Sequence, residues 1–272
     1  MTISDLRQEA PVDGAERPSV TGPVTDDVFL GDRLVVRQPR HGYRAGIDAV
    51  LLAASVRLAP DDAATLLDIG AGAGTVGLCA AARLPDLRAV LLEREPALVA
   101  MAGGNITANG LAGRVRAVAG SITASATDLA ALGLAANSFS QCVANPPYHD
   151  EEAGTPARDA LKAASHAMPA DALDDWARFM ARMVRPGGRA TMIHKADALP
   201  RLLAVLAPRF GALAVFPVFP RAGEDAIRVI VSGIKGSRAP MTLRAGLVLH
   251  GAGQDFTDET SAILRGGGAL EI

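Results

Sequence analysis

The stretch Leu66-Leu67-Asp68-Ile69-Gly70-Ala71-Gly72-Ala73-Gly74-Thr75-Val76-Gly77-Leu78 begins as an apolar run, breaks into alternating glycines and then resumes as helix-forming sequence. This pattern predicts a strand, a tight turn and a helix. Glycine at every second position lets the backbone adopt positive φ angles and approach a ligand closely, and the first amides of the next helix point into that gap. The stretch therefore predicts a binding loop for a small ligand, although a glycine-rich turn that binds nothing has the same pattern.

The spacing of these glycines indicates which ligand the loop suits. Dinucleotide-binding loops carry glycines at the first, third and sixth positions, whereas the sixth position here is Thr75. Gly70, Gly72 and Gly74 instead form G-x-G-x-G after Asp68, which suits a ligand with an amino-acid end and no pyrophosphate. S-adenosylmethionine is such a ligand, and we predict that these glycines and Asp68 bind it.

The composition fits one large domain. The chain has 272 residues, 49% of them hydrophobic, and a net charge of −2, so a nucleic-acid partner would have to be met by a local basic patch. Cys79 and Cys142 lie far apart and are predicted to be buried and reduced. Because we find neither a secretory leader nor a long uncharged apolar run, we expect a soluble, cytoplasmic protein.

Strand and helix patterns alternate along most of the chain. Residues 1–27 are rich in Pro, Gly and Ser without a period and predict a tail that lacks regular structure. Residues 28–60 predict a basic hairpin and a helix that Asp48 could cap, and they lead into a catalytic core at 61–272. Seven strands are predicted, at 66–69, 88–93, 115–119, 139–144, 189–194, 213–216 and 227–234. The fold class is therefore α/β, a Rossmann-like, doubly wound and mostly parallel sheet that binds ligands at the carboxyl ends of its strands.

Two further strand ends supply candidate cofactor ligands. Glu93 ends the second strand about twenty residues after the glycine-rich loop, where a carboxylate can accept both ribose hydroxyls. Ser121 and Ile122 follow the third strand, where the adenine of the cofactor would lie. A helix cap and core packing explain these last two residues equally well.

Asn145, Pro146, Pro147 and Tyr148 follow the fourth strand and give the sharpest signal for chemistry. The prolines fix φ and hold the residue before each extended, so the Asn145 amide and the Pro146 carbonyl point in a set direction. Two acceptors then converge on one amine, while Tyr148 offers an aromatic face to a planar group. We predict that these four residues are catalytic and that Asn145 also contacts the cofactor.

With these motifs the chain resembles the class I S-adenosylmethionine-dependent methyltransferases that carry N-P-P-Y. Two further stretches resemble the bacterial tRNA adenine-N6 methyltransferases that modify the anticodon loop of a valine tRNA. These stretches are Gly46-Ile47-Asp48-Ala49-Val50-Leu51-Leu52 and Thr155-Pro156-Ala157-Arg158-Asp159. The resemblance implies S-adenosylmethionine as cofactor, with Asp48 in its site, and a tRNA as substrate. Ile47 and Ser121 depart from the family, which has a threonine and an acid there.

Basic residues flank the cofactor half of the chain and could hold an RNA backbone, although solvated surface charge is the usual role of such clusters. The candidates are Arg37, Arg40, Arg44, Arg158, Lys235 and Arg238. None of the histidines has metal-ligand spacing, so no metal is proposed.

Three other functions share some of these sequence features. A protein glutamine N5-methyltransferase acting on release factors uses the same N-P-P-Y logic on an amide, but that family usually begins with a helical domain, against which the basic hairpin argues. A non-catalytic RNA-binding relative is a second alternative, and Asp68, Glu93 and Asn145 speak against it. A nicotinamide dehydrogenase is disfavoured by Thr75.

Overall fold

The computed structural model describes residues 22–41, 44–58, 64–148 and 172–272. The strands are β1 (Val24–Phe29), β2 (Leu34–Pro39), β3 (Thr65–Ile69), β4 (Arg88–Glu93), β5 (Val115–Ala119), β6 (Phe139–Ala144), β7 (Val184–Lys195), β8 (Phe210–Phe219), β9 (Arg228–Lys235), β10 (Thr242–Leu243) and β11 (Leu247–Val248). The helices are α1 (Ile47–Ala54), α2 (Thr75–Arg83), α3 (Pro96–Ala108), α4 (Ala126–Ala131), α6 (Ala172–Met183), the short η1 (Ala196–Ala198), α7 (Leu199–Leu206) and α8 (Asp258–Leu264).

The central sheet has nine strands in the order β10-β8-β9-β7-β6-β3-β4-β5, with β11 also paired to β8. Strands β3 to β7 run parallel to one another, whereas β9 runs antiparallel to both β7 and β8. The prediction of an α/β fold with a mostly parallel sheet is confirmed, and the two short strands β10 and β11 extend the seven expected ones. The carboxyl ends of β3 to β7 meet at one edge, called here the carboxyl edge, which also receives the first residue of β9.

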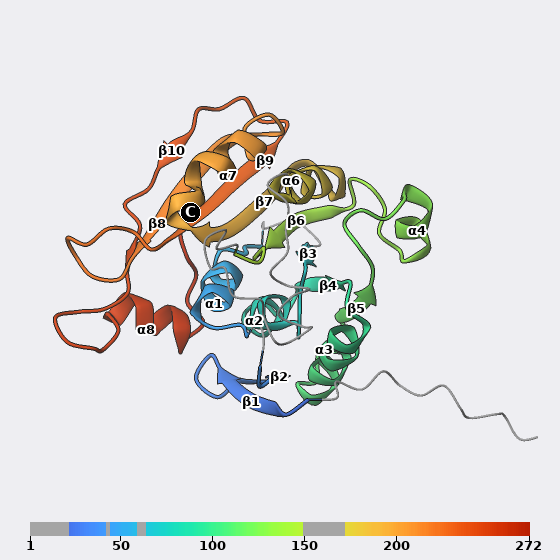
Figure 1. Ribbon diagram of the computed structural model, residues 1–272, viewed down its shortest axis with the longest axis horizontal. Coiled ribbons are helices and arrows are strands. Elements are labelled where there is room, and N and C mark those ends of the chain that lie inside the picture. The colour runs from blue at the N-terminus through green and yellow to red at the C-terminus, as the bar shows by residue number, and fades with distance from the viewer. Residues whose placement is uncertain (1–21, 42–43, 59–63, 149–171) are drawn as a thin grey trace, which may run out of the picture.

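Helices cover both faces of this sheet. α1, α2, α3 and α8 lie on one face, and α4, α6 and α7 on the other (Figure 1). In β3, Leu66 packs in the first apolar cluster and Leu67 in the second, because successive strand residues point to opposite faces. Both faces are thus buried, which is why the strands read as continuous apolar runs. Among the described residues, no helix has the length and apolar character needed to cross a membrane.

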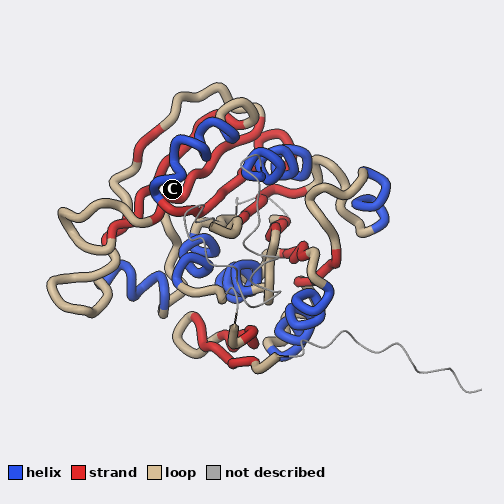
Figure 2. Tube along the Cα trace, in the orientation of Figure 1, coloured by secondary structure: helices blue, strands red, loops and turns tan. Residues whose placement is uncertain are grey.

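The hairpin of β1 and β2 lies apart from the central sheet (Figure 2). It begins at Val24, so residues 24–27, which the sequence assigns to a structureless tail, are part of a strand. Two acids of β1 are held by arginines: Asp26 pairs with Arg37 at 2.9 Å and Asp27 with Arg44 at 2.7 Å. Residues 1–21 lie outside the described part of the chain.

Pro186-Gly187-Gly188, a sequence typical of the end of a helix, lies within β7. α6 ends at Met183 and β7 begins directly at Val184, which pairs with Phe139 of β6. The register then shifts before Arg189 pairs with the next residues of β6. The Pro-Gly-Gly segment thus interrupts the pairing and does not separate helix from strand.

The segment 266–272 returns to the α1 face of the molecule. The amide of Leu270 donates to the carbonyl of Ala54 at 2.9 Å, at the end of α1. Nearby, Nε of Arg83 donates to the carbonyl of Gly267 at 2.9 Å. These bonds fasten α1 and α2 to a segment that lies some two hundred residues further along the chain.

Candidate active site

The glycine-rich loop (residues 70–74) joins β3 to α2 at the carboxyl edge. Gly70, Gly72 and Gly74 have φ angles of +66°, +57° and +93°, in the left-handed region that glycine adopts without strain. The amides of Gly70 and Ala71 both donate to the carbonyl of Leu92, at 2.9 and 3.0 Å, and so fasten the loop to β4. The loop is therefore a rigid turn whose conformation the glycines permit.

The three glycines have different surroundings. A Cβ atom on Gly70 would lie 2.4 Å from the ring of Trp176, and one on Gly74 would lie 2.8 Å from Leu91. A Cβ on Gly72 would meet no atom within 4 Å. Packing against Trp176 and Leu91 thus requires glycine at positions 70 and 74. Gly72 faces open space, in which a ligand can approach the backbone.

Glu93, the last residue of β4, lies beside this open space. Its carboxylate accepts hydrogen bonds from the amides of Gly72 at 2.8 Å, Arg94 at 2.8 Å and Glu95 at 3.0 Å, and the residue is only 8% exposed. These bonds fix the carboxylate against the glycine-rich loop, where it can also accept a hydrogen bond from a ligand hydroxyl. Ribose binding by Glu93 stays a prediction.

Asp68 lies beneath the loop and not on its surface. Its carboxylate is buried and accepts a hydrogen bond from the amide of Gly77, in the first turn of α2, at 2.9 Å. Burial raises the pKa of Asp68 to about 7, against the opposing effect of the Gly77 hydrogen bond. The sequence suggested that Asp68 binds the cofactor directly, whereas the contact found in the structure holds the start of α2.

Ser121 and Ile122 follow β5 at the same edge. The preceding amide, that of Gly120, donates to the carbonyl of Glu93 at 2.9 Å. The Ser121 hydroxyl accepts the amide of Thr123 at 3.2 Å, and Ile122 is half-buried against the second apolar cluster. Both residues thus lie one strand beyond Glu93, and their described contacts are those of a turn and of the core.

Asn145 and Tyr148 stand on the other side of the loop, after β6. Ile69 and Ala144 are paired neighbours on β3 and β6, so Gly70 and Asn145 are the next residues of two adjacent strands. The Tyr148 hydroxyl lies 2.9 Å from Oδ1 of Asn145. Pro146 between them is buried and Pro147 is half-buried, so the turn is held in place. The structure thus brings the predicted catalytic residues to the glycine-rich loop.

Asp48 comes to this cluster from α1. It lies within the first turn of the helix, which begins at Ile47, and it makes no capping bond there, contrary to the expectation. Its Oδ2 accepts hydrogen bonds from the Tyr148 hydroxyl at 2.9 Å and from Nε of Arg228 at 2.8 Å. The guanidinium carbon of Arg228 also lies 5.1 Å from the centre of the Tyr148 ring. Asp48 and Arg228 therefore both contact Tyr148 and hold its ring in place.

His194, near the end of β7, packs against Tyr148. The ring centroids are 4.7 Å apart in an edge-to-face arrangement. His194 is buried, and its Nδ1 accepts the amide of Lys195 at 2.9 Å. Burial, with the charge of Arg201 nearby, lowers the pKa of His194 to about 4. The imidazole is therefore neutral at physiological pH and adds no charge beside Arg228.

Arg228 and His194 belong to this cluster but were not predicted as active-site residues from the sequence. Arg228 is the first residue of β9, and it reaches the carboxyl edge because β9 runs antiparallel to β7 and pairs it with Lys195. His194 follows the apolar run of β7, two residues beyond Met192, which pairs with Ala144 at the end of β6. A residue at the carboxyl end of a predicted parallel strand was thus a usable signal for His194, whereas the direction of β9 gave none for Arg228.

The predicted RNA-binding residues are divided between two places. Arg37 and Arg44 lie on and just after the hairpin, each paired with an acid of β1, while Arg40 between them is exposed. Lys235 ends β9 beside the first residue of β8, at the edge opposite the glycine-rich loop, and its ammonium group donates to the carbonyl of Val184 at 2.9 Å.

Arg238 follows Lys235 at that opposite edge, and Arg158 lies outside the described residues. The hairpin and the end of β9 thus do not form one surface. Within the described ranges there is no group of His, Cys, Asp and Glu side chains that could hold a metal ion.

Comparisons with known proteins agree with this arrangement. Residues 47–171 match the family model of the methyltransferase small domain. A tRNA1(Val) (adenine(37)-N6)-methyltransferase of Porphyromonas gingivalis is 30% identical over 183 residues, which are 65% of this chain and 68% of that protein. A release factor glutamine methyltransferase of Moorella thermoacetica is 34% identical over 158 residues, which are 55% of this chain and about half, 51%, of that protein.

A solved structure of a methyltransferase is also similar to this chain. It is described as a predicted O-methyltransferase from Agrobacterium tumefaciens, is 30% identical, and superimposes with a TM-score of 0.68 over 82% of this chain and 98% of that one. The open space over Gly72 and the carboxylate of Glu93 beside it fit a nucleoside ligand with a ribose. The chain therefore belongs to the S-adenosylmethionine-dependent methyltransferases, and S-adenosylmethionine is its cofactor.

Proposed function

We propose that this methyltransferase methylates the exocyclic N6 amine of an adenine in the anticodon region of a tRNA. The observation that carries the proposal is the position of Asn145, which continues β6 where the neighbouring strand β3 continues into Gly70. An amine held by Asn145 would thus lie next to the cofactor loop. The relative from Porphyromonas gingivalis, whose name specifies tRNA and adenine N6, supports the choice of acceptor.

In this proposal, bound S-adenosylmethionine supplies an electrophilic methyl group. The side-chain oxygen of Asn145 and the carbonyl of Pro146 accept hydrogen bonds from the amine of the target base. These bonds draw the nitrogen lone pair out of conjugation with the ring and aim it for in-line displacement. The alkylated nitrogen becomes acidic and loses its proton late, so that no strong general base is required.

The contacts around Tyr148 give it a positioning role in the same proposal. A phenolic hydroxyl has one proton to donate, and two acceptors lie 2.9 Å from it, Asp48 Oδ2 and Asn145 Oδ1. Asp48 carries a charged carboxylate, which Arg228 holds in place, and a carboxylate is a stronger acceptor than the neutral amide oxygen of Asn145. Tyr148 in this proposal donates to Asp48, and the side chain of Asn145 faces the same cluster. The target base, splayed from its stack, would then lie against the part of the Tyr148 ring that Arg228 and His194 do not cover.

The hairpin supports an RNA substrate over a protein one. Its second strand ends at Pro39, and the exposed Arg40 follows it, eight residues before Asp48 of the active site. Arginines so close to the site can hold phosphate groups of the RNA backbone. Cys79 and Cys142 are buried free thiols, which fits the reducing cytoplasm where tRNA is modified.

Glutamine methylation is the second candidate function. The relative from Moorella thermoacetica favours it, since an amide nitrogen can be held by Asn145 and Pro146 in the same way. The match spans only about half of that relative, and residues 24–39, which precede α1, form a hairpin.

The test is methylation by the purified full-length chain with isotopically labelled S-adenosylmethionine. Unmodified tRNA and a release factor are offered in separate reactions, and digested products are analysed by mass spectrometry. We expect N6-methyladenosine in tRNA and no label in the release factor. Label on a glutamine, or on an oxygen atom of either substrate, would overturn the proposal. A protein that binds S-adenosylhomocysteine but labels neither substrate would also count against it.

A further inference from the structure

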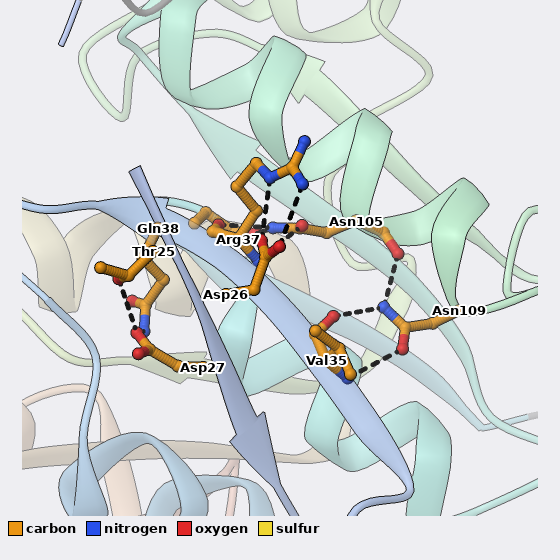
Figure 3. Close-up of polar contacts among 9 residues, drawn as sticks. Thr25, Asp26, Asp27, Val35, Arg37, Gln38, Asn105 and Asn109 are labelled. Carbon is orange, nitrogen blue, oxygen red and sulfur yellow. Dashed lines mark hydrogen bonds and ion pairs between the residues drawn. The ribbon is translucent and has the colours of Figure 1, made fainter. Parts of the chain in front are cut away.

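The outer edge of β2 is joined to α3 through two asparagines instead of a third strand (Figure 3). Asn109 Oδ1 accepts the amide of Val35 at 3.0 Å, and its Nδ2 donates to the carbonyl of the same residue at 2.7 Å. Asn105, one helical turn earlier, makes the same two bonds with Arg37, both at 2.9 Å. The two side chains thus satisfy the backbone groups that β2 turns away from β1.

Each asparagine makes one further bond, but only the bond from Asn105 reaches the cofactor loop. Its Nδ2 donates a second hydrogen to the carbonyl of Ala73 at 2.9 Å, and the side chain is buried, 3% exposed. Two donor hydrogens and one acceptor oxygen are then all engaged, which fixes the orientation of the amide. Asn109 uses its second donor on the carbonyl of Asn105 at 2.8 Å, within the helix.

Ala73 lies between the two glycines that shape the ligand end of the loop. On one side of it, the amide of Gly72 is held by Glu93, which we expect to bind the ribose. On the other side, Gly74 is the N-cap of α2. The loop is therefore held from two directions, by a carboxylate of β4 and by an amide of α3 that is itself engaged by the hairpin.

We propose that Asn105 is a positioning residue of the cofactor site, through which the β1–β2 hairpin supports the glycine-rich loop. Without it, the carbonyl of Ala73 and the amide of Arg37 would lose their partners in a partly buried place. The loop would sample other conformations, and the space over Gly72 would be less well formed. The inference concerns cofactor binding, so it holds whichever acceptor is methylated.

The test compares Asn105→Ala with Asn109→Ala. Both variants lose two bonds to β2, but only the first loses the bond to the loop. We expect Asn105→Ala to weaken binding of S-adenosylhomocysteine about tenfold, the effect of one lost hydrogen bond, and to raise the KM for S-adenosylmethionine with little change in kcat. Asn109→Ala should change neither the affinity for S-adenosylhomocysteine nor the KM for S-adenosylmethionine by more than about twofold. The single tryptophan, Trp176, which packs on Gly70, can report binding by fluorescence.

A second measurement tests the loop itself in the ligand-free protein. Hydrogen exchange of residues 70–76 should accelerate in Asn105→Ala and stay unchanged in Asn109→Ala. If Asn105→Ala does not fold, Asn105→Asp at pH 8 keeps the acceptor for Arg37 and removes both donors, so it should show the same weaker binding. Equal effects of the alanine variants on affinity and exchange would overturn the proposal, as would normal affinity in a folded Asn105 variant.

Discussion

The Tyr148 hydroxyl lies 2.9 Å from a carboxylate oxygen of Asp48, a residue 100 positions earlier in the chain. The same oxygen accepts Nε of Arg228 at 2.8 Å. A helix of the lead-in, the turn after β6 and the start of β9 are thus joined at one atom. This junction makes α1 part of the candidate active site.

The junction predicts that Asp48→Asn impairs catalysis more than cofactor binding. Loss of the charge weakens the bonds to Tyr148 and Arg228, and hydrogen bonds to charged groups contribute about 1.5–3 kcal/mol each. We expect kcat to fall by about tenfold or more, with a similar loss in Tyr148→Phe, and an unchanged Kd for S-adenosylhomocysteine. If Asp48→Asn instead raises that Kd and leaves kcat alone, Asp48 is a cofactor ligand, as the family resemblance implies.

Asn145→Ala should remove chemistry while leaving both ligands bound. The lost acceptor matters most when the amine becomes tetrahedral, so the single-turnover rate with saturating tRNA and cofactor should fall by about 10²–10³. Tyr148→Ala should in addition raise the apparent KM for RNA, by a stacking contribution of about 1–3 kcal/mol. A normal chemical step in Asn145→Ala would contradict the role proposed for this residue.

Glu93→Ala should weaken binding of S-adenosylmethionine. The carboxylate holds the amide of Gly72 and would accept charge-assisted bonds from the ribose, each contributing roughly 1.5–3 kcal/mol. We expect the Kd to rise by about one to two orders of magnitude, measured by calorimetry. Asp86→Ala, which removes an acid from the turn before β4 at the opposite edge, is the matched control and should have no effect.

We predict that the free energy of unfolding of the ligand-free protein depends on pH through Asp68. Its folded-state pKa, about 7, is higher than the ordinary value of 3.8, so the folded chain binds this proton more tightly than the unfolded chain does. Its contribution is therefore full below pH 4 and is lost as the pH rises toward 7. Urea titrations at several pH values measure the free energy of unfolding. This free energy should fall less steeply with pH in Asp68→Asn than in the wild-type protein. The same pH dependence in both proteins would refute the raised pKa of Asp68.

Arg40 should contribute more to RNA binding than Arg37 or Arg44. All three arginines are exposed, but Arg37 and Arg44 are each paired with an acid, so Arg40→Ala should reduce the salt dependence of tRNA binding by about 0.7 in log–log slope for one lost phosphate contact. Replacing all three residues should flatten it further without changing cofactor affinity. Arg238→Ala, at the opposite edge of the sheet, is the control. If it reduces the salt dependence of tRNA binding as much as Arg40→Ala does, the hairpin is not the main contact for the RNA backbone.

Much of the fold could be predicted because its signals are local. The apolar runs at 66–69 and 139–144 are buried on both faces, and the glycines between β3 and α2 have the positive φ angles that their spacing suggested. The start of the hairpin could not be predicted in this way. Asp26 and Asp27 look like tail residues until Arg37 and Arg44 are brought beside them by the pairing of β1 with β2.

The candidate site was predictable where one residue ends one strand, as for Glu93 and Asn145. It was not predictable where contacts depend on distant parts of the chain. The bond between Asp48 and Tyr148, and the place of Arg228 over the Tyr148 ring, depend on the antiparallel direction of β9 and on how α1 packs. Asn105 likewise shows only as a polar residue in a helix until its partners in β2 and the loop are known.

The bond from Leu270 to Ala54 has a consequence for how the protein is made. During synthesis α1 emerges early, but the backbone group at its end acquires this partner only after more than two hundred further residues have left the ribosome. Until then the surface that α1 presents to segment 266–272 is uncovered. We infer that the packing of α1, the helix that carries Asp48, is completed only after residue 270 has been translated.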